Sequence, residues 1–197
     1  MSSIKLTADS GGGTFEIKAP SSSSNTRVLT LPDTGNYILG GRVLQVVQAV
    51  KTDTASTNSA TYADISGLSV SITPSSTSNK ILVECSVVTG GQQDGFLAFK
   101  VLRDSTAIGI GTAGTGNQTN ASFSTAFGNA STHQFAVKPA SWSFLDSPSS
   151  TSSLTYKVQW ASTYLSRTMY VNRPYTAADN AYTAITISTI TVKEVAA

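Results

Sequence analysis

Residues 154–160 read Leu-Thr-Tyr-Lys-Val-Gln-Trp, so large apolar side chains alternate strictly with polar ones. Residues 68–73, Leu-Ser-Val-Ser-Ile-Thr, repeat the pattern. A period of two is that of a β-strand with one face buried and the other in water. These two stretches predict an all-β protein in which each strand contributes one face to a core.

The rest of residues 42–197 extends this pattern to nine or ten expected strands, separated by turns rich in Pro, Ser, Asn and Gly. A spacing of roughly 8 to 12 residues between many of the strands is typical of a β-sandwich or jelly roll. In the last strand the apolar positions change phase after Ile187, which predicts a β-bulge at Ser188–Thr189. The expected strands are 43–50, 68–73, 80–88, 96–102, 106–110, 134–145, 154–160, 169–171 and 184–195.

The composition supports this fold class. Of the 197 residues, 30 are Ser and 27 are Thr, whereas only 12% are charged and 40% are hydrophobic. That hydrophobic share argues against a disordered chain, and the scarcity of charge argues against a helical bundle with solvated faces. The net charge of +2 comes from scattered residues with no basic run, so nothing indicates nucleic-acid binding.

Several classes of site and segment are excluded or not expected. The single cysteine, Cys85, rules out an intrachain disulfide, and one Cys with one His rules out a Cys/His zinc site within one chain. Cys85 shares a strand face with Val83 and Val87 and is expected to be a small core residue. No run of 18 apolar residues predicts a membrane span, and Met1 to Gly13 lack the apolar region of a secretory signal.

Catalytic patterns are weak, and we expect neither an enzyme nor a cofactor. The only imidazole, that of His133, has no G-x-S-x-G nucleophile motif to serve. Glu84 and Asp94 could meet as a glycosidase pair, but the Asp residues occupy turn-like settings, where their local backbone bonds are the better interpretation. Residues 109–114 match G-x-G-x-x-G, yet no helical pattern follows, so this motif is interpreted as a turn.

The first 41 residues differ from the rest. Their short apolar pieces are interrupted by Gly11–Gly13, Pro20 and Pro32, and such a segment is too small to bury a core alone. A solvated tail and strands ordered by another chain both remain open. We expect a joint at Gly40–Gly41, with residues 1–41 as an attachment segment or stalk and residues 42–197 as an independent domain. The candidate attachment residues are Phe15, Ile17, Val28, Leu29 and Leu31.

Two long connections, 111–132 and 172–182, are the candidate ligand-binding segments, because loops on a rigid scaffold often carry recognition. Tyr164 and Tyr170, at strand ends or in loops, are further candidates for contact surfaces. The first connection offers amides and hydroxyls that suit sugar hydroxyls, and the second offers residue types frequent at binding hot spots. The candidate contact residues are Asn117, Gln118, Asn120, Arg173, Tyr175 and Tyr182.

Five stretches of the sequence are distinctive. Two lie near the N-terminus, Gly12-Gly-Thr-Phe-Glu-Ile-Lys-Ala-Pro20 and Asn25-Thr-Arg-Val-Leu-Thr-Leu-Pro-Asp33; the later ones are Ile65-Ser-Gly-Leu-Ser-Val-Ser-Ile-Thr-Pro74, Ser143-Phe-Leu-Asp-Ser-Pro148 and Ile187-Ser-Thr-Ile-Thr-Val-Lys-Glu-Val-Ala196. They resemble stretches in fibre proteins of tailed bacteriophages, especially phages of marine bacteria. The strand order expected after Arg42 is also similar to the trimeric jelly roll of the tumour-necrosis-factor and C1q type, a likeness of topology only.

These resemblances imply a virion structural protein: a homotrimeric fibre or spike subunit with a short β stalk and a jelly-roll head. They imply a place in the tail fibre or tail tip and contact with a host-surface glycan or protein, with residues 1–41 bound to other virion proteins. Two alternatives remain open: a capsid-surface head fibre or decoration protein, and a fibre-borne glycan hydrolase. No nucleic acid, membrane insertion, metal or cofactor is implied.

Overall fold

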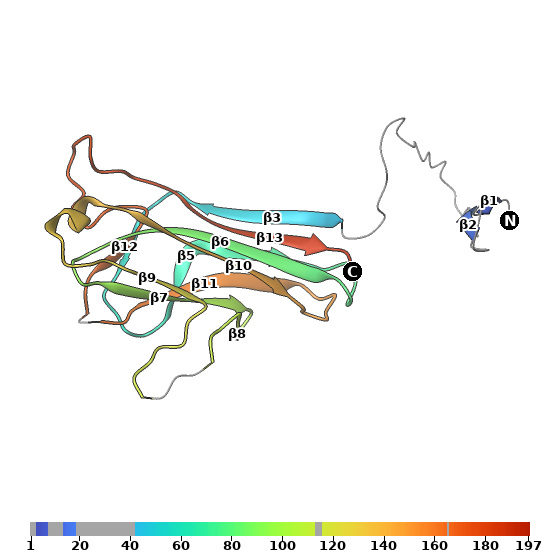
Figure 1. Ribbon diagram of the computed structural model, residues 1–197, viewed down its shortest axis with the longest axis horizontal. Helices are drawn as coiled ribbons and strands as arrows, with labels where there is room; N and C mark the ends of the chain where they lie inside the picture. Colours follow the sequence, from blue (N-terminus) through green and yellow to red (C-terminus); the bar gives the residue numbers. More distant parts are fainter. Residues whose placement is uncertain (1–2, 8–13, 19–41, 113–115, 165) are drawn as a thin grey trace. The chain divides into compact units, whose positions relative to one another are not determined.

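The computed structural model describes residues 3–7, 14–18, 42–112, 116–164 and 166–197 (Figure 1). The chain divides into two compact units, Met1–Tyr37 and Ile38–Ala197. In the first unit, β1 (Ser3–Thr7) and β2 (Thr14–Lys18) pair antiparallel, with Ser3 opposite Lys18. The expected joint at Gly40–Gly41 lies outside the described residues.

The five candidate attachment residues fall in or near this first unit. Phe15 and Ile17 belong to β2, opposite Leu6 and Ile4 of β1. Val28, Leu29 and Leu31 lie outside the described residues. Their role in attachment therefore stays a prediction.

The second unit is built from antiparallel strands, as expected for an all-β protein, and among its described residues the only helical segment is a single 3-10 turn. No helix in the described part of the chain could cross a membrane. The elements are β3 (Val43–Lys51), β4 (Ala55–Thr57), β5 (Ala63–Ile72), β6 (Lys80–Gly91), β7 (Phe96–Arg103), β8 (Thr106–Ile108), β9 (Phe123–Ala126), η1 (Ser131–Phe135), β10 (Lys138–Asp146), β11 (Leu154–Ser162), β12 (Met169–Val171) and β13 (Ser188–Val195).

The strands form two sheets with jelly-roll connectivity. One sheet has the order β3-β13-β6-β10, and the short strands β12 and β4 continue it beside the end of β6. The other sheet has the order β5-β11-β7, with β8 and β9 both pairing to the far edge of β7. With β8 and β9 sharing one position, the eight main strands in chain order run 1-8-3-6 and 2-7-4-5, so most consecutive strands change sheet. This is the order of a jelly-roll sandwich.

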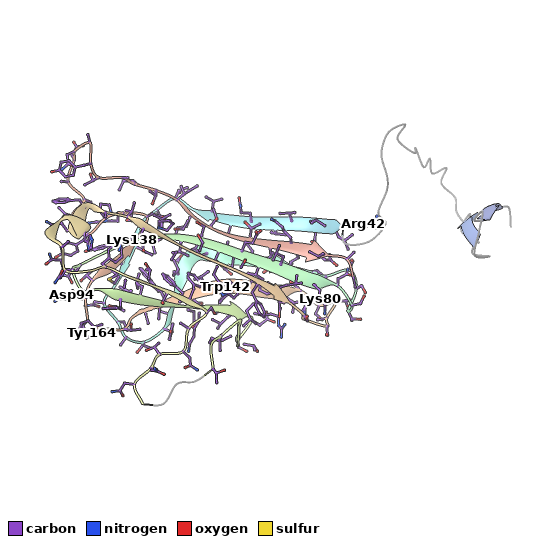
Figure 2. All side chains as sticks on the ribbon, in the orientation of Figure 1. Arg42, Lys80, Asp94, Lys138, Trp142 and Tyr164 are labelled. Atoms are coloured by element: carbon purple, nitrogen blue, oxygen red, sulfur yellow. The ribbon has the colours of Figure 1, made fainter. Side chains whose placement is uncertain are left out.

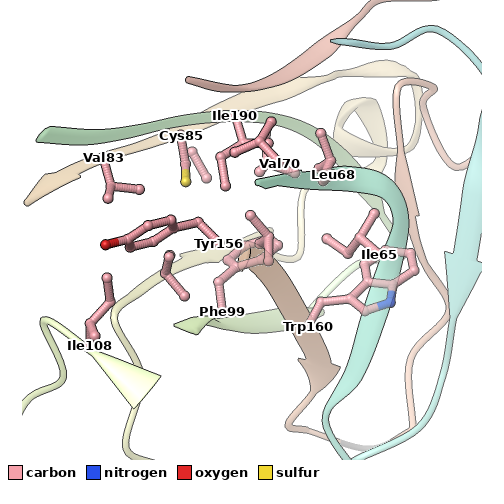
Figure 3. Packing of buried hydrophobic residues seen from close by; sticks show 14 of the residues in the cluster. Ile65, Leu68, Val70, Val83, Cys85, Phe99, Ile108, Tyr156, Trp160 and Ile190 are labelled. Atoms are coloured by element: carbon pink, nitrogen blue, oxygen red, sulfur yellow. The ribbon is translucent and has the colours of Figure 1, made fainter. Parts of the chain in front are cut away.

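The core lies between the two sheets (Figure 3). The alternation in β11 places Tyr156 and Val158 fully inside, and β5 contributes Leu68 in the same way. Cys85 of β6 is 3% exposed among them, which confirms its predicted place in the core. Burial raises the pKa of the Cys85 thiol to about 12, so the reactive thiolate is suppressed.

Two predictions about strand boundaries are wrong. Gln134 and Phe135 end the 3-10 turn η1, and β10 begins only at Lys138. At the C-terminus, β13 begins at Ser188 and no bulge forms there. Ile185 and Ile187 instead lie in an irregular segment, 65% and 54% exposed.

The connection 111–132 also contains more structure than its composition indicated. Phe123–Ala126 forms β9, which pairs with the first half of β7. The ring of Phe123 stacks between Phe99 and Trp142, with centroids 4.6 Å and 6.2 Å away. These apolar contacts across the edge of the sandwich stabilise a strand that local sequence did not predict.

A buried carboxylate fixes the C-terminal strand. Glu194 is 1% exposed and accepts hydrogen bonds from Gln45, Asn79 and both the amide and the hydroxyl of Ser75, at 2.6 to 2.8 Å. Burial alone would raise the pKa of Glu194, but these hydrogen bonds outweigh it and lower the pKa to about 2. Glu194 thus ties β13 to β3 and to the turn that precedes β6.

A second buried group joins the two sheets. Asp146, at the end of β10, accepts a hydrogen bond of 2.7 Å from the hydroxyl of Tyr156 in β11. Arg103 of β7 donates to both oxygens of the same carboxylate, at 2.9 and 2.7 Å. Burial, together with the bond to Asp146, raises the pKa of Tyr156. The Asp146 carboxylate therefore has partners from the opposite sheet at this end of the core.

We predict that Glu194→Gln lowers the free energy of unfolding by about 2 to 3 kcal/mol, because the new amide group would face hydrogen-bond donors. In the wild type, the depressed pKa means that this stabilisation is complete above pH 4.5 and is lost as the pH falls toward 2. Urea unfolding between pH 7 and pH 2.5 measures both effects. Asp64→Asn, which changes a half-exposed carboxylate paired with Lys157 on the other sheet, is the matched control. An unchanged stability of Glu194→Gln at pH 7 would contradict the prediction.

Candidate functional site

An open cleft of about 800 Å³ lies on the outer face of β7 and β9. Leu97 and Phe99 of β7 face the core. Because side chains alternate along a strand, Phe96 and Ala98 face the outer side of the sheet. They pair with Ala126 and Ser124 of β9, whose side chains are small. Small side chains on the floor leave room for a ligand.

Two aromatic rings form one side of the cleft. The backbone amide of Thr163 donates to the carbonyl of Phe96 at 3.0 Å, which holds the segment after β11 beside β7. Tyr164 then meets Phe96 edge to face, with ring centroids 5.5 Å apart. The two residues are 49% and 44% exposed. Both therefore offer ring surface to a ligand.

The connection before β9 forms the other side, with Asn117 and Thr119 among the lining residues. The Tyr62 hydroxyl donates to the carbonyl of Asn120 at 2.9 Å, and the backbone amide of Ser122 donates to the backbone carbonyl of Phe99 at 2.7 Å. Burial also raises the pKa of the Tyr62 hydroxyl above its ordinary value. These bonds fix the end of the connection against the sheet. The other lining residues are Asp94, Leu97, Ala121, Thr125 and Thr163.

This lining suits a sugar more than an ionic or purely apolar ligand. Aromatic rings pack against the C–H faces of a pyranose, while amides and hydroxyls exchange hydrogen bonds with its hydroxyl groups. Asn117, Thr119 and Ser124 supply such groups, and Asp94 is the one carboxylate among the lining residues. The volume and open shape fit a segment of an oligosaccharide.

The predicted contact residues of the first connection gather here in part. Asn117 lines the cleft itself. Gln118 and Asn120 line an adjoining recess, which shares Thr119, Ala121 and Ser124 with the cleft. Ligand contact by these residues stays a prediction, but the structure places them on one continuous surface.

The predicted residues of the second connection do not line this cleft. Arg173 is used internally: its guanidinium lies 4.4 Å from the centroid of the Tyr170 ring and donates to the carbonyls of Pro174 and Tyr175. The same segment packs so closely on β6 that a Cβ at Gly90 would lie 2.1 Å from the Arg173 carbonyl oxygen. Only glycine fits at such a contact.

Tyr175 and Tyr182 lie elsewhere on the same connection. The Tyr175 hydroxyl accepts a hydrogen bond from Gln92 at 3.1 Å and lines a separate recess. Tyr182 is 66% exposed and meets Phe135 of η1 edge to face.

The sequence predicts only one of the two aromatic residues of the cleft as a contact. Tyr164 is a candidate for a contact surface, whereas Phe96 is predicted only as the start of a strand. One signal was present: Phe96 lies out of phase with Leu97, Phe99 and Val101, so a period-two strand must point it outward. Its proximity to Tyr164 depends on strand pairing, which no local pattern gives.

The two carboxylates considered as a glycosidase pair, Glu84 and Asp94, lie far apart. Glu84 lies within β6 and pairs with Lys193, whereas Asp94 lies in the turn beyond the strand end. The extended residues from Glu84 to Gly91 alone span about 23 Å, beyond the separation of a glycosidase pair. Asp94 adopts φ 55°, as a turn Asp often does. Within the described residues, no three His, Cys, Asp or Glu side chains gather as metal ligands would.

The cleft occupies one end of the sandwich. Figure 2 shows Asp94 and Tyr164 at this end, and Arg42 and Lys80 at the opposite end. Residue 42 is where the chain enters the sandwich, so the cleft lies far from the point at which residues 1–41 are joined.

No protein-family model matches the chain, and no curated protein matches it. Among solved structures, it is similar to one titled "Structure of infectious bursal disease virus Gx strain", with 12% sequence identity and a TM-score of 0.36. The match covers 98% of this chain and 49% of that chain, so this chain spans about half the length of its neighbour.

Proposed function

We propose that the protein is a structural subunit of a tailed-phage virion, a homotrimeric fibre or spike of the tail, whose jelly-roll head contacts a host-surface glycan. Residues 1–41 attach it to other virion proteins. The proposal needs no enzymatic activity and no cofactor. It is supported by the phage-fibre motifs in the sequence, by the jelly-roll strand order and by the cleft.

The position of the cleft carries the proposal. A fibre head must be joined to the particle at one end and present its contact surface at the other. Arg42 and the cleft residues Asp94 and Tyr164 lie at opposite ends of the sandwich (Figure 2). A ligand in the cleft is thus held away from the end where the attachment segment begins.

One face of the sandwich supports the trimer. The outer face of the β3-β13-β6-β10 sheet carries several exposed apolar side chains: Val46 is 57% exposed, Val50 48% and Leu145 52%. The pairing places Val46 opposite Lys193, Lys193 opposite Leu82, and Leu82 opposite Leu145, which makes one row across the sheet. Three of the four positions in this row are apolar, with Lys193 between Val46 and Leu82. Exposed apolar side chains grouped in this way are typical of a surface that another chain covers.

The outer face of the other sheet is polar where β5 pairs with β11. It carries Ser69, Ser71 and Thr155, with Ser71 and Thr155 hydrogen-bonded at 3.0 Å. Short hydroxyl side chains of this kind are compatible with permanent exposure to water. We therefore infer that subunits contact each other through the face that holds Val46 and Leu145.

We predict that the wild-type protein has a solution mass three times that of the 20.5 kDa chain. The double variant Val46→Glu with Leu145→Glu should dissociate to monomers, because each charge would be buried at the subunit contact at a cost of several kcal/mol. Size-exclusion chromatography with light scattering measures the mass. Ser69→Glu, on the opposite face, is the control and should remain a trimer. A monomeric wild type at micromolar concentration would contradict the proposal.

We predict that Phe96→Ala and Tyr164→Ala each weaken binding to the host-envelope glycan at least tenfold, because each removes about half of the aromatic surface of the cleft. Both residues are exposed, so the thermal midpoint should change little. Tyr182→Ala, which removes an exposed aromatic side chain outside the cleft, is the matched control. Binding is measured by calorimetry with glycan fragments purified from the host envelope.

Two outcomes of that experiment would redirect the interpretation. Equal binding by all three variants would show that the cleft does not bind the host glycan. Release of shortened glycan during the titration, detected by mass spectrometry, would favour the hydrolase alternative over a binding protein.

Cryo-electron microscopy of particles of the encoding phage, decorated with antibody fragments against residues 42–197, tests the location. We expect the label on the tail fibre or tail tip. Label on the capsid shell would favour the alternative of a head fibre or decoration protein. Absence of label from intact particles, with the protein present in the infected cell, would contradict a virion role.

A further inference from the structure

The recess that Tyr175 lines has a volume of about 280 Å³ and borders the turn between β6 and β7. Gln92 and Gln93 of this turn line the recess, whereas the next residue, Asp94, lines the cleft. The other lining residues, Gln134, Arg167 and Tyr175, come from η1, from the segment between β11 and β12, and from the segment after β12. Four separate parts of the chain therefore converge on one polar recess.

The hydrogen bonds around the recess use up acceptors and leave donors free. The Gln92 Oε1 atom accepts from the amide of Thr168 at 2.7 Å, which fixes the side-chain amide, and its Nε2 donates to the Tyr175 hydroxyl. The Gln134 Oε1 atom accepts from the Thr176 hydroxyl at 3.1 Å. Within the described residues, no acceptor is bonded to the Tyr175 O–H, to the Gln134 NH₂ group or to the second N–H of Gln92, so these donors can serve a ligand.

Arg167 adds a positive charge to this set of donors. Its Nε atom is buried and has no hydrogen-bond partner among the described residues. None of the residues that line the recess is acidic. Its backbone is held in place, because its amide donates to the Tyr164 carbonyl and its carbonyl accepts from the Ser162 hydroxyl. A buried donor without an acceptor is unfavourable, and an anion beside the guanidinium would offset this cost through its charge.

We infer that this recess binds the anionic group of an acidic sugar, a carboxylate or a sulfate. A planar guanidinium matches the oxygens of either group, and the Gln134 and Tyr175 donors can complete their coordination. The volume is that of a single small group, not of a chain. The identity of the ligand as a sugar rests on the proposed function, whereas the preference for an anion rests on the recess alone.

The test uses the full-length protein and calorimetry at physiological salt, where weak surface attraction is largely screened. The probes are oligogalacturonate, which carries carboxylates, carrageenan oligosaccharide, which carries sulfates, and neutral maltohexaose. We expect binding of at least one acidic probe and none of maltohexaose at the same concentration. The acidic probe that binds identifies the group.

Arg167→Gln should weaken binding of the acidic probe at least tenfold, and Arg167→Lys should weaken it less. The matched control is Arg42→Gln, which removes the same charge at the end of the sandwich opposite to Tyr164 (Figure 2) and should change affinity less than twofold. Gln134→Glu, which places a negative charge in the recess, should also weaken binding at least tenfold and carries the test if the Arg167 variants do not fold.

Equal losses in Arg167→Gln and Arg42→Gln would show only a general charge effect and would overturn the inference. So would wild-type protein that binds neither acidic probe, or a Gln134→Glu variant that binds as well as the wild type. These results are independent of where the protein lies on the particle. A failure of the anion site is therefore distinguishable from a failure of the proposed virion role.

Discussion

The C-terminal strand β13 lies between β3 and β6, and the rest of the sandwich depends on this placement. Ile190 and Val192 of β13 are fully buried and supply the middle of the core on this sheet. The sheet is complete only when the last residues of the chain insert between the first strand of the sandwich and a strand from its middle. Such long-range pairing is costly in entropy, so strong local contacts must hold the strand once it is in place.

Polar groups hold both ends of that strand. At one end, the Glu194 carboxylate accepts four hydrogen bonds from β3 and from the turn before β6. At the other end, the Ser188 hydroxyl donates to Asn172 at 2.6 Å and accepts from the amide of Val88. The Asn172 side chain in turn donates to the carbonyls of Lys51 and Asp53. Buried polar groups that are fully bonded in this way define a single register.

The two ends of the sandwich differ in structure. The end near Arg42 is closed by the Glu194 hydrogen bonds and receives the chain from the first unit. The opposite end carries the aromatic cleft, which Tyr164 lines, and the recess that Arg167 lines. A rigid β scaffold with its chemistry in the connecting segments is suited to recognition without a large conformational change.

The sequence by itself determined the all-β class, the sandwich architecture and most of the core, because alternation with a period of two says which face of each strand is buried. It correctly placed Tyr156, Trp160 and Cys85 inside. It misjudged Ile185 and Ile187, because apolar residues that continue a strand pattern look the same whether or not a partner strand is beside them. Only the tertiary structure decided that the last strand, β13, begins at Ser188.

The candidate sites were decided almost wholly by tertiary structure. Asn117 could be selected from the composition of its loop. Phe96 forms one side of the cleft only together with Tyr164, which lies 68 positions away and is brought beside it by the pairing of β11 with β7. The recess around Arg167 joins side chains from four segments that no local pattern relates. Secondary structure follows from neighbours in sequence, whereas a binding site follows from neighbours in space, and in a jelly roll most neighbours in space are far apart along the chain.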